Sequence, residues 1–184
     1  MMQLNQALAF TNMYKDLIFW DRISAEFLVP NVTFRLEFGS EKSFDLPFMV
    51  VSKLFWIFSQ IGLHRIHFLH TGIAEKLSEK EEGGILFNSS DAFIYTHLYQ
   101  DESLMIRHNT IQSIEFDSKS KITEWTIKFV KFEEFRKTAS EEIDSDEFIW
   151  GFPKRVLEYL EVALVMNSVL PDQTSWLTWF YTYI

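Results

Sequence analysis

Three strand-like runs dominate the second half of this sequence, and only short polar turns separate them. The runs cover residues 92–99, 104–116 and 122–132. The turns, residues 101–103 and 117–120, are built from Asp, Glu, Ser and Lys, which favour chain reversal. Strands joined so closely pair most simply as antiparallel hairpins. The chain is therefore expected to fold around an antiparallel meander, without parallel βαβ units.

The first half of the chain alternates between helical and strand-like spacing. Residues 4–28 carry apolar side chains at helical spacing, which predicts a long amphipathic helix that stops at Pro30 and Asn31. Residues 32–38 and 43–46 have strand character, which in the first run is a strict alternation of apolar and polar side chains. We expect a helix, two strands and a tight turn between them.

A second helix is predicted to begin at Pro47 and to end at Gly62. Strand character then resumes over residues 63–69. The Glu-rich segment 72–84 ends in Gly-Gly and indicates a solvated helix or loop. Residues 133–146 are acidic and poor in apolar side chains, which predicts a flexible excursion.

Two helices are expected to close the chain, one over residues 152–169 and a short one over about 172–184. This order of elements predicts an α+β fold, with a bent antiparallel sheet packed on helices and a C-terminal helical extension. We divide the chain into residues 1–150, the main α+β domain, and residues 151–184, whose helices complete the core and bind partners.

Composition excludes several function classes. The formal net charge of −9 repels phosphate backbones, so we expect no direct nucleic-acid binding. The chain has no Cys, which removes disulfides, thiolate nucleophiles and Cys-ligated zinc. We find no signal peptide or membrane span. The 19 Phe, 6 Trp and 6 Tyr exceed what one small core can hold, so some should cover a second chain.

Neither a metal site nor a catalytic site is predicted, and we expect no cofactor. His64, His67 and His70 form the one visible ligand cluster, but on a strand His67 points away from the other two. An acid–base pocket remains an alternative, because a carboxyl group buried among apolar side chains can have a raised pKa. Its candidate residues are Tyr14, Asp21, Glu26, His97 and His108. We expect aromatic side chains to fill that pocket instead.

The predicted helix over residues 152–169 is apolar on most of its circumference, so it should be buried on two sides or buried on one and used for association on the other. One stripe contains Val156 and Leu160, and the other contains Val162, Val165, Met166 and Val169. We predict that these six residues form a dimer or core interface. Burial within the chain's own domain is the alternative.

The tail gathers large apolar side chains with few charges to solubilise them. Trp and Tyr dominate interface hot spots, so we predict a partner-binding surface here. Its residues are Trp176, Leu177, Trp179, Phe180 and Tyr183. A tail that folds back on the core is the alternative.

Four segments in order resemble the dimerisation domain of the LIM-domain-binding (Ldb/Chip/SEUSS) family of transcriptional adaptors. They cover the chain from about Tyr14 to Val169, and one departure is Ser59-Gln60 where the family has Gly-Gly. The matching segments are Phe19-Trp20-Asp21 with Glu26-Phe27-Leu28, Ile57-Phe58 before the strand over 63–69, Phe116-Asp117 with Lys121-Ile122 and Trp125, and Leu157-x-Tyr159-Leu160.

The resemblance implies a nuclear-transport-factor-2-like cone that homodimerises, with a C-terminal segment that binds a partner of the LisH or single-stranded-DNA-binding-protein (SSDP) type. It implies a nuclear, non-enzymatic coregulator. The departures indicate a fungal member, similar to regulators of filamentous or invasive growth. The alternatives from other classes are a small-molecule-binding protein or an isomerase- or dehydratase-like enzyme with a pocket in the cone, and a transport carrier.

Overall fold

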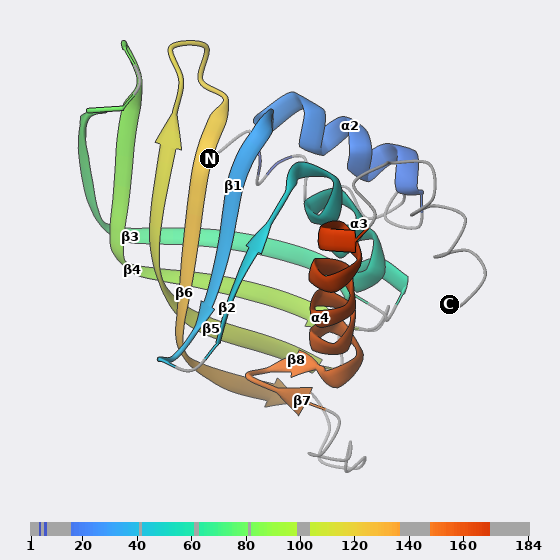
Figure 1. The fold of residues 1–184 in the computed structure, drawn as a ribbon. Coiled ribbons are helices and arrows are strands. Elements are labelled where there is room, and N and C mark those ends of the chain that lie inside the picture. Colours follow the sequence, from blue (N-terminus) through green and yellow to red (C-terminus); the bar gives the residue numbers. More distant parts are fainter. Residues whose placement is uncertain are drawn as a thin grey trace.

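In the described part of the computed structural model, a bent six-stranded sheet wraps around the three helices α2, α3 and α4 (Figure 1). The structure describes residues 4, 6, 16–40, 42–60, 63–80, 82–98, 104–136 and 148–169. The helices are α2 (Leu17–Phe27), α3 (Phe48–Gln60) and α4 (Lys154–Val169). They lie on the concave side of the sheet. None of the helices within these ranges is long and apolar enough to cross a membrane.

The sheet has the strand order β2-β1-β6-β5-β4-β3. Its strands are β1 (Leu28–Phe38), β2 (Lys42–Leu46), β3 (Leu63–Leu77), β4 (Ile85–Leu98), β5 (Leu104–Phe116) and β6 (Ile122–Arg136). A separate short hairpin, β7 (Phe148–Ile149) and β8 (Phe152–Pro153), precedes α4. The predicted α+β fold with its antiparallel meander is confirmed, since β3 to β6 pair in sequence order.

One strand pair departs from the predicted antiparallel sheet. β1 runs parallel to β6, with Phe34 opposite Trp125, so the sheet is mixed. This pairing joins segments about ninety residues apart. Apolar periodicity within one strand tells which face is buried but not which way a distant partner runs. The parallel direction of β1 and β6 therefore could not be predicted from the sequence.

The first boundary also differs from the prediction. Asp16 caps α2 by accepting a hydrogen bond from the backbone N–H of Ile18 at 2.9 Å, and the helix ends at Phe27. Pro30 does not end a helix but lies within β1. The register of β1 against β6 jumps from Leu28 to Thr33, so the missing N–H of proline breaks no paired position there.

Two segments predicted as loops continue the sheet. β3 runs on to Leu77 and pairs with β4 throughout, so the prediction of a solvated helix or loop was wrong for residues 72–77. Residues 71–77 are exposed on both faces, which explains why their sequence lacks alternation. β6 likewise reaches Arg136 and takes up the start of the predicted acidic excursion. Residues 137–147 lie outside the described residues.

A bulge produces the bend of the sheet. Ser89 and Ala92 of β4 are both buried although they are three residues apart, because the register against β5 shifts between them. On β3, Gly72 lies beside this bulge and has a φ of +59°. The extra residues that a bulge inserts kink a strand and increase its twist. The kink bends β3 and β4 away from the helix-covered core and leaves an exposed arm beyond Gly72.

Candidate functional site

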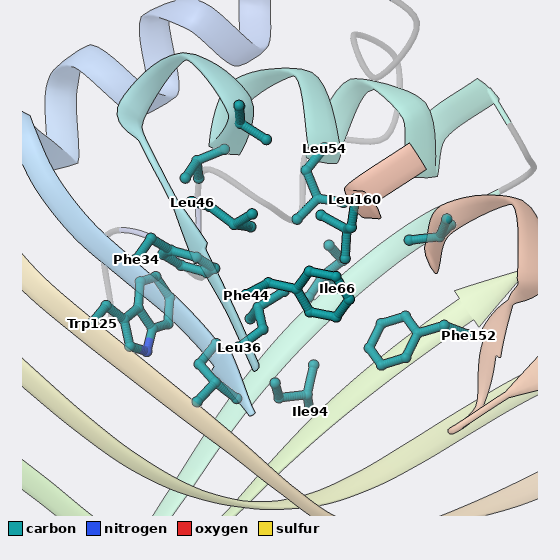
Figure 2. Packing of buried hydrophobic residues seen from close by; sticks show 14 of the residues in the cluster. Phe34, Leu36, Phe44, Leu46, Leu54, Ile66, Ile94, Trp125, Phe152 and Leu160 are labelled. Carbon is teal, nitrogen blue, oxygen red and sulfur yellow. The ribbon is translucent and has the colours of Figure 1, made fainter. Parts of the chain in front are cut away.

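The concave side of the sheet, where a cone-shaped enzyme would need its pocket, is filled with side chains (Figure 2). The indole of Trp125 packs edge-on against Phe34, with 5.2 Å between ring centroids, and in a tilted arrangement against Phe68, at 5.3 Å. Phe44 and Leu46 from β2 and Leu54 from α3 point into the same space. These aliphatic and aromatic contacts leave the interior apolar.

The buried polar groups under this core bind one another. The Nε1–H of Trp125 donates to Oε1 of Gln112 at 3.2 Å, and the Gln112 amide donates to the Thr110 hydroxyl at 3.0 Å. That hydroxyl donates to the carbonyl oxygen of Ala92 at 3.2 Å. Burying polar groups costs little free energy when they are hydrogen-bonded to one another in this way. The hydrogen bonds of these four residues therefore belong to the fold itself.

The predicted acid–base candidates do not come together. His108 is buried and stacks on Phe152 at 4.5 Å, with its Nε2 3.2 Å from the carbonyl oxygen of Trp150. Burial lowers the pKa of His108 to about 4. Asp21 and Glu26 are exposed on α2. Tyr14 and the side chain of His97 lie outside the described residues.

The turn of the β7–β8 hairpin packs closely against the imidazole ring of His108. Gly151 has a φ of +73°, and a Cβ on it would lie 2.8 Å from Nε2 of His108. Glycine is the residue that adopts this backbone without strain, and here it also lets the hairpin turn approach the imidazole ring. His108 therefore anchors the β7–β8 hairpin to the sheet.

His67 and His70 of β3 lie on opposite faces of the sheet, as the alternation of strand residues predicted. His67 pairs with Tyr95 on the convex face, whereas His70 pairs with the buried Ala92. Burial among apolar neighbours, including Phe87 at 5.1 Å, lowers the pKa of His70 to about 4. The side chain of His64 lies outside the described residues. Among the side chains that are described, no three His, Asp or Glu come together in a way that could hold a metal ion.

The two stripes of α4 have different surroundings. Val156 and Leu160 are each 1% exposed and belong to the chain's own core. Val162 and Val165, from the second stripe, are 41% and 62% exposed. The side chains of Met166 and Val169 lie outside the described residues, as do the predicted partner-binding residues Trp176, Leu177, Trp179, Phe180 and Tyr183. Their role in binding stays a prediction.

A groove of about 600 Å³ runs between α4, the β7–β8 hairpin and the start of β2. Its apolar part is formed by Phe38, Ile149, Trp150 and Leu157. At its rim Lys42 pairs with Glu161, and a second Lys–Glu pair lies one turn earlier on α4 at 3.8 Å. These pairs neutralise the rim, so the groove offers no unbalanced charge to a ligand.

The convex face carries a group of apolar and aromatic side chains that the sequence analysis missed. We define the convex patch as Leu69, Phe93, Tyr95, Arg107 and Phe135. The Arg107 guanidinium lies 5.5 Å from the ring centroids of both Phe93 and Phe135, a cation–π arrangement. Leu69 and Phe135 are 49% and 42% exposed.

An alternation signal for this patch was present in the sequence. In β5, the buried Ile106 and His108 flank Arg107, so Arg107 must face outward. A half-buried strand normally places polar residues at such outward positions. Leu69, Phe93 and Phe135 depart from that rule. In the sequence, Leu69 and Phe93 fall in predicted strands but Phe135 falls in the predicted flexible excursion over residues 133–146, so their common face was not predicted.

Known proteins of similar fold include several enzymes. A hexachlorocyclohexane dehydrochlorinase is 9% identical, with 78% of this chain and 97% of that chain covered and a TM-score of 0.46. A naphthalene 1,2-dioxygenase is 6% identical, with 71% and 81% covered and a TM-score of 0.46. A nuclear-transport-factor-2-like protein of unknown function from Exiguobacterium sp. is 10% identical, with 69% and 98% covered and a TM-score of 0.43. These likenesses say nothing about the chemistry of this chain.

The α+β fold predicted from the sequence, a bent sheet packed on helices, is confirmed, although the sheet is mixed and not purely antiparallel. No curated protein sequence matches the chain.

The segments that carried the family resemblance form the framework of this cone. Trp20 of α2 and Trp125 of β6 are both fully buried in the core. Asp117 closes the β5–β6 turn by accepting hydrogen bonds from the backbone N–H groups of Lys119 and Lys121, at 2.9 and 2.8 Å. The family model of the LIM-domain binding proteins matches residues 1–140. With this match over most of its length, the chain belongs to the LIM-domain-binding protein family.

Proposed function

We propose that this chain is a non-enzymatic transcriptional coregulator domain that homodimerises and recruits LisH-containing, SSDP-like transcription factors in the nucleus. Membership of the LIM-domain-binding family supports a coregulator or adaptor role. The family name also indicates a link to LIM-domain proteins. Departures from the family pattern, such as Ser59-Gln60, are the basis for proposing a fungal role in filamentous or invasive growth.

The filled interior is the observation that carries the non-enzymatic proposal. Small-molecule sites are concave clefts of about 300–1,000 Å³ in which a few polar groups converge. In the described part of the chain, Trp125, Phe34 and Phe68 occupy that place in the cone. The polar groups beside them, such as Gln112, are engaged with one another. The arrangement favours function through the outer surface.

A hollow with carboxylates does exist at the outer end of the sheet, with a volume of about 320 Å³. Its Glu115 and Glu124 both pair with Lys80, and its Asp117 holds the β5–β6 turn. The carboxylates therefore have structural partners. This weighs against the alternative of an isomerase- or dehydratase-like enzyme.

The tail is the surface to test for partner recruitment. With the full chain as bait in nuclear extract, we expect LisH-containing transcription factors to be enriched. Replacing Trp176 and Trp179 by Ser should lower that recovery strongly, because one hot-spot truncation costs about 2 kcal/mol, or about thirtyfold in affinity. Bait carrying Ile73→Lys, on the exposed arm, serves as the control. Absence of LisH proteins with the unaltered chain, or equal recovery with the Trp variant, would contradict the proposed recruitment.

A further inference from the structure

We infer that the free edge of the exposed arm binds an extended segment of a partner protein that carries a basic residue between two apolar ones. We define the arm edge as residues 73–77 of β3. The inference goes beyond the proposed function, because it assigns a second binding site, distinct from the recruitment proposed for the tail. It does not depend on that recruitment or on the homodimer.

The backbone of the arm edge is open on one side. β3 is the last strand of the six-stranded sheet, so no strand in the described part of the chain pairs with its outer side. On the inner side, residues 73–77 pair with residues 85–89 of β4 in continuous register. Every second residue of such a strand points its N–H and C=O groups outward. These donors and acceptors have the spacing of a strand, and an added extended chain is the ligand that satisfies them.

Two aliphatic side chains of the arm edge are exposed on the same face as a carboxylate. Ile73, Glu75 and Leu77 share this face because alternate residues of a strand point the same way. Glu75 and Leu77 lie directly opposite Phe87 and Ile85 of β4. Ile73 is 53% and Leu77 77% exposed, although Phe87 beside them is buried. Figure 1 shows the arm on the opposite side of the sheet from α3 and α4, so these helices do not cover the two side chains.

The arm edge lacks the features that normally block a free edge. Natural sheets protect such edges with proline, with bulges or with lysine side chains. Residues 73–77 contain no proline, and the irregularity at Gly72 lies before them. Their one lysine, Lys76, points to the face opposite Glu75, and its Nζ lies 3.2 Å from a carboxylate oxygen of Glu79. The edge is therefore accessible to a strand-forming ligand.

Unpaired carboxylates determine the charge that this ligand needs. Glu75 is exposed, and no ion pair among the described residues includes it. The same is true of Asp91, which lies at the base of the arm. Lys80 in the β3–β4 turn is held by two carboxylates of β5 and β6 and does not offset these charges. A cation opposite Glu75 would form a favourable cross-strand pair, and the net charge of −9 attracts basic segments.

A second copy of this chain does not fit the arm edge. Antiparallel pairing of two identical edges that brings Ile73 opposite Leu77 also brings Glu75 opposite the other copy's Glu75. Like charges directly opposite each other destabilise a strand pair. A segment with the pattern apolar-x-basic-x-apolar places a cation there instead. Because this pattern is symmetric, it fits the edge in either strand direction.

The first test is an NMR titration of the isotope-labelled full chain with a synthetic peptide, acetyl-Thr-Val-Thr-Lys-Thr-Val-Thr-amide. We expect saturable shifts of the backbone amide signals of residues 73–77, and hydrogen exchange about tenfold slower at the outward N–H groups there. The same peptide with N-methyl groups on its central residues cannot donate hydrogen bonds and should bind about tenfold more weakly. Absence of saturable shifts, or equal binding of the methylated peptide, would overturn the inference.

The second test exchanges the charges of the proposed pair. A peptide with Glu in place of Lys should bind the unaltered chain about fivefold more weakly, and Glu75→Lys should reverse this preference. Glu82→Lys is the matched control, because it makes the same change of net charge at an exposed position in the β3–β4 turn. It should leave the preference for the Lys peptide unchanged. Equal effects of the two substitutions would mean that an acidic protein attracts the peptide without a specific site.

A third measurement separates the arm edge from the proposed function. The Ile73→Lys chain should lose the peptide, yet sediment like the unaltered chain and recover LisH-containing proteins as before. Circular dichroism melting checks that this variant is folded. A change in sedimentation or in LisH-protein recovery would give the edge a different occupant and overturn the inference. Failure of the unaltered chain to dimerise or to recover LisH proteins would instead remove the proposed function and leave the edge site standing.

Discussion

Replacing Trp125 by alanine is expected to lower the free energy of unfolding by about 3–5 kcal/mol, the usual cost of removing a large aromatic side chain from a core. Trp125 is 1% exposed and contacts Phe34 and Phe68 from two different strands. Its Nε1–H also satisfies the buried Gln112 carbonyl. A domain of this size has a total stability of about 5–15 kcal/mol, so the loss is a large share of it.

Urea unfolding followed by tryptophan fluorescence and circular dichroism measures this change. Trp125→Phe should cost less, about 1–3 kcal/mol, because it keeps most of the packing and leaves the Gln112 oxygen without its donor. Trp56→Ala, at a half-buried position on α3, controls for the loss of an indole as such. If Trp125→Ala cost no more than Trp56→Ala, the core could not be packed around Trp125 as described.

Acid is expected to destabilise the fold because His108 is buried in its neutral form. The pKa of His108 falls from an ordinary 6.5 to about 4 because the ring is buried. Between these two pH values the unfolded chain binds a proton that the folded chain does not, so stability decreases as the pH falls. The stability is complete above about pH 6.5. Its loss by pH 4 amounts to about 3 kcal/mol for His108.

Stability measured by urea unfolding at steps from pH 7.5 to pH 4.5 tests this expectation. His70 contributes to the same slope, because burial lowers the pKa of His70 to about 4 as well. His108→Phe keeps an aromatic ring against Phe152 and should remove the His108 share, while the double variant with His70→Phe should be nearly flat. The lowered pKa of Asp45, whose partner is Arg35, affects only lower pH values. A slope that is unchanged in His108→Phe would mean that this ring is not buried in the folded chain.

The order and type of most elements could be predicted because each strand reports its own buried face. The alternation in residues 32–38 and 104–116 reflects contact with one core, and the structure has strands there. The parallel pairing of β1 with β6 could not be predicted, since it depends on how β2, α3 and the meander return the chain. The exposed arm after Gly72 was missed because a strand with two solvated faces has no alternation to read.

The candidate binding surfaces show the same limit. The spacing of apolar residues in α4 predicted two apolar stripes. In the structure, Leu160 of the first stripe is buried in the core and Val165 of the second stripe is exposed. Composition alone could not say which stripe packs inside. The convex patch needs the register of four strands before Phe93, Arg107 and Phe135 become neighbours. Surplus aromatic residues therefore predicted an interface without locating it.

Sedimentation equilibrium of the unaltered full chain at micromolar concentration is the most direct test of function through assembly. We expect a reversible dimer, with a fitted mass of twice the 21.9 kDa chain. A single species of one-chain mass across the whole concentration range would contradict it.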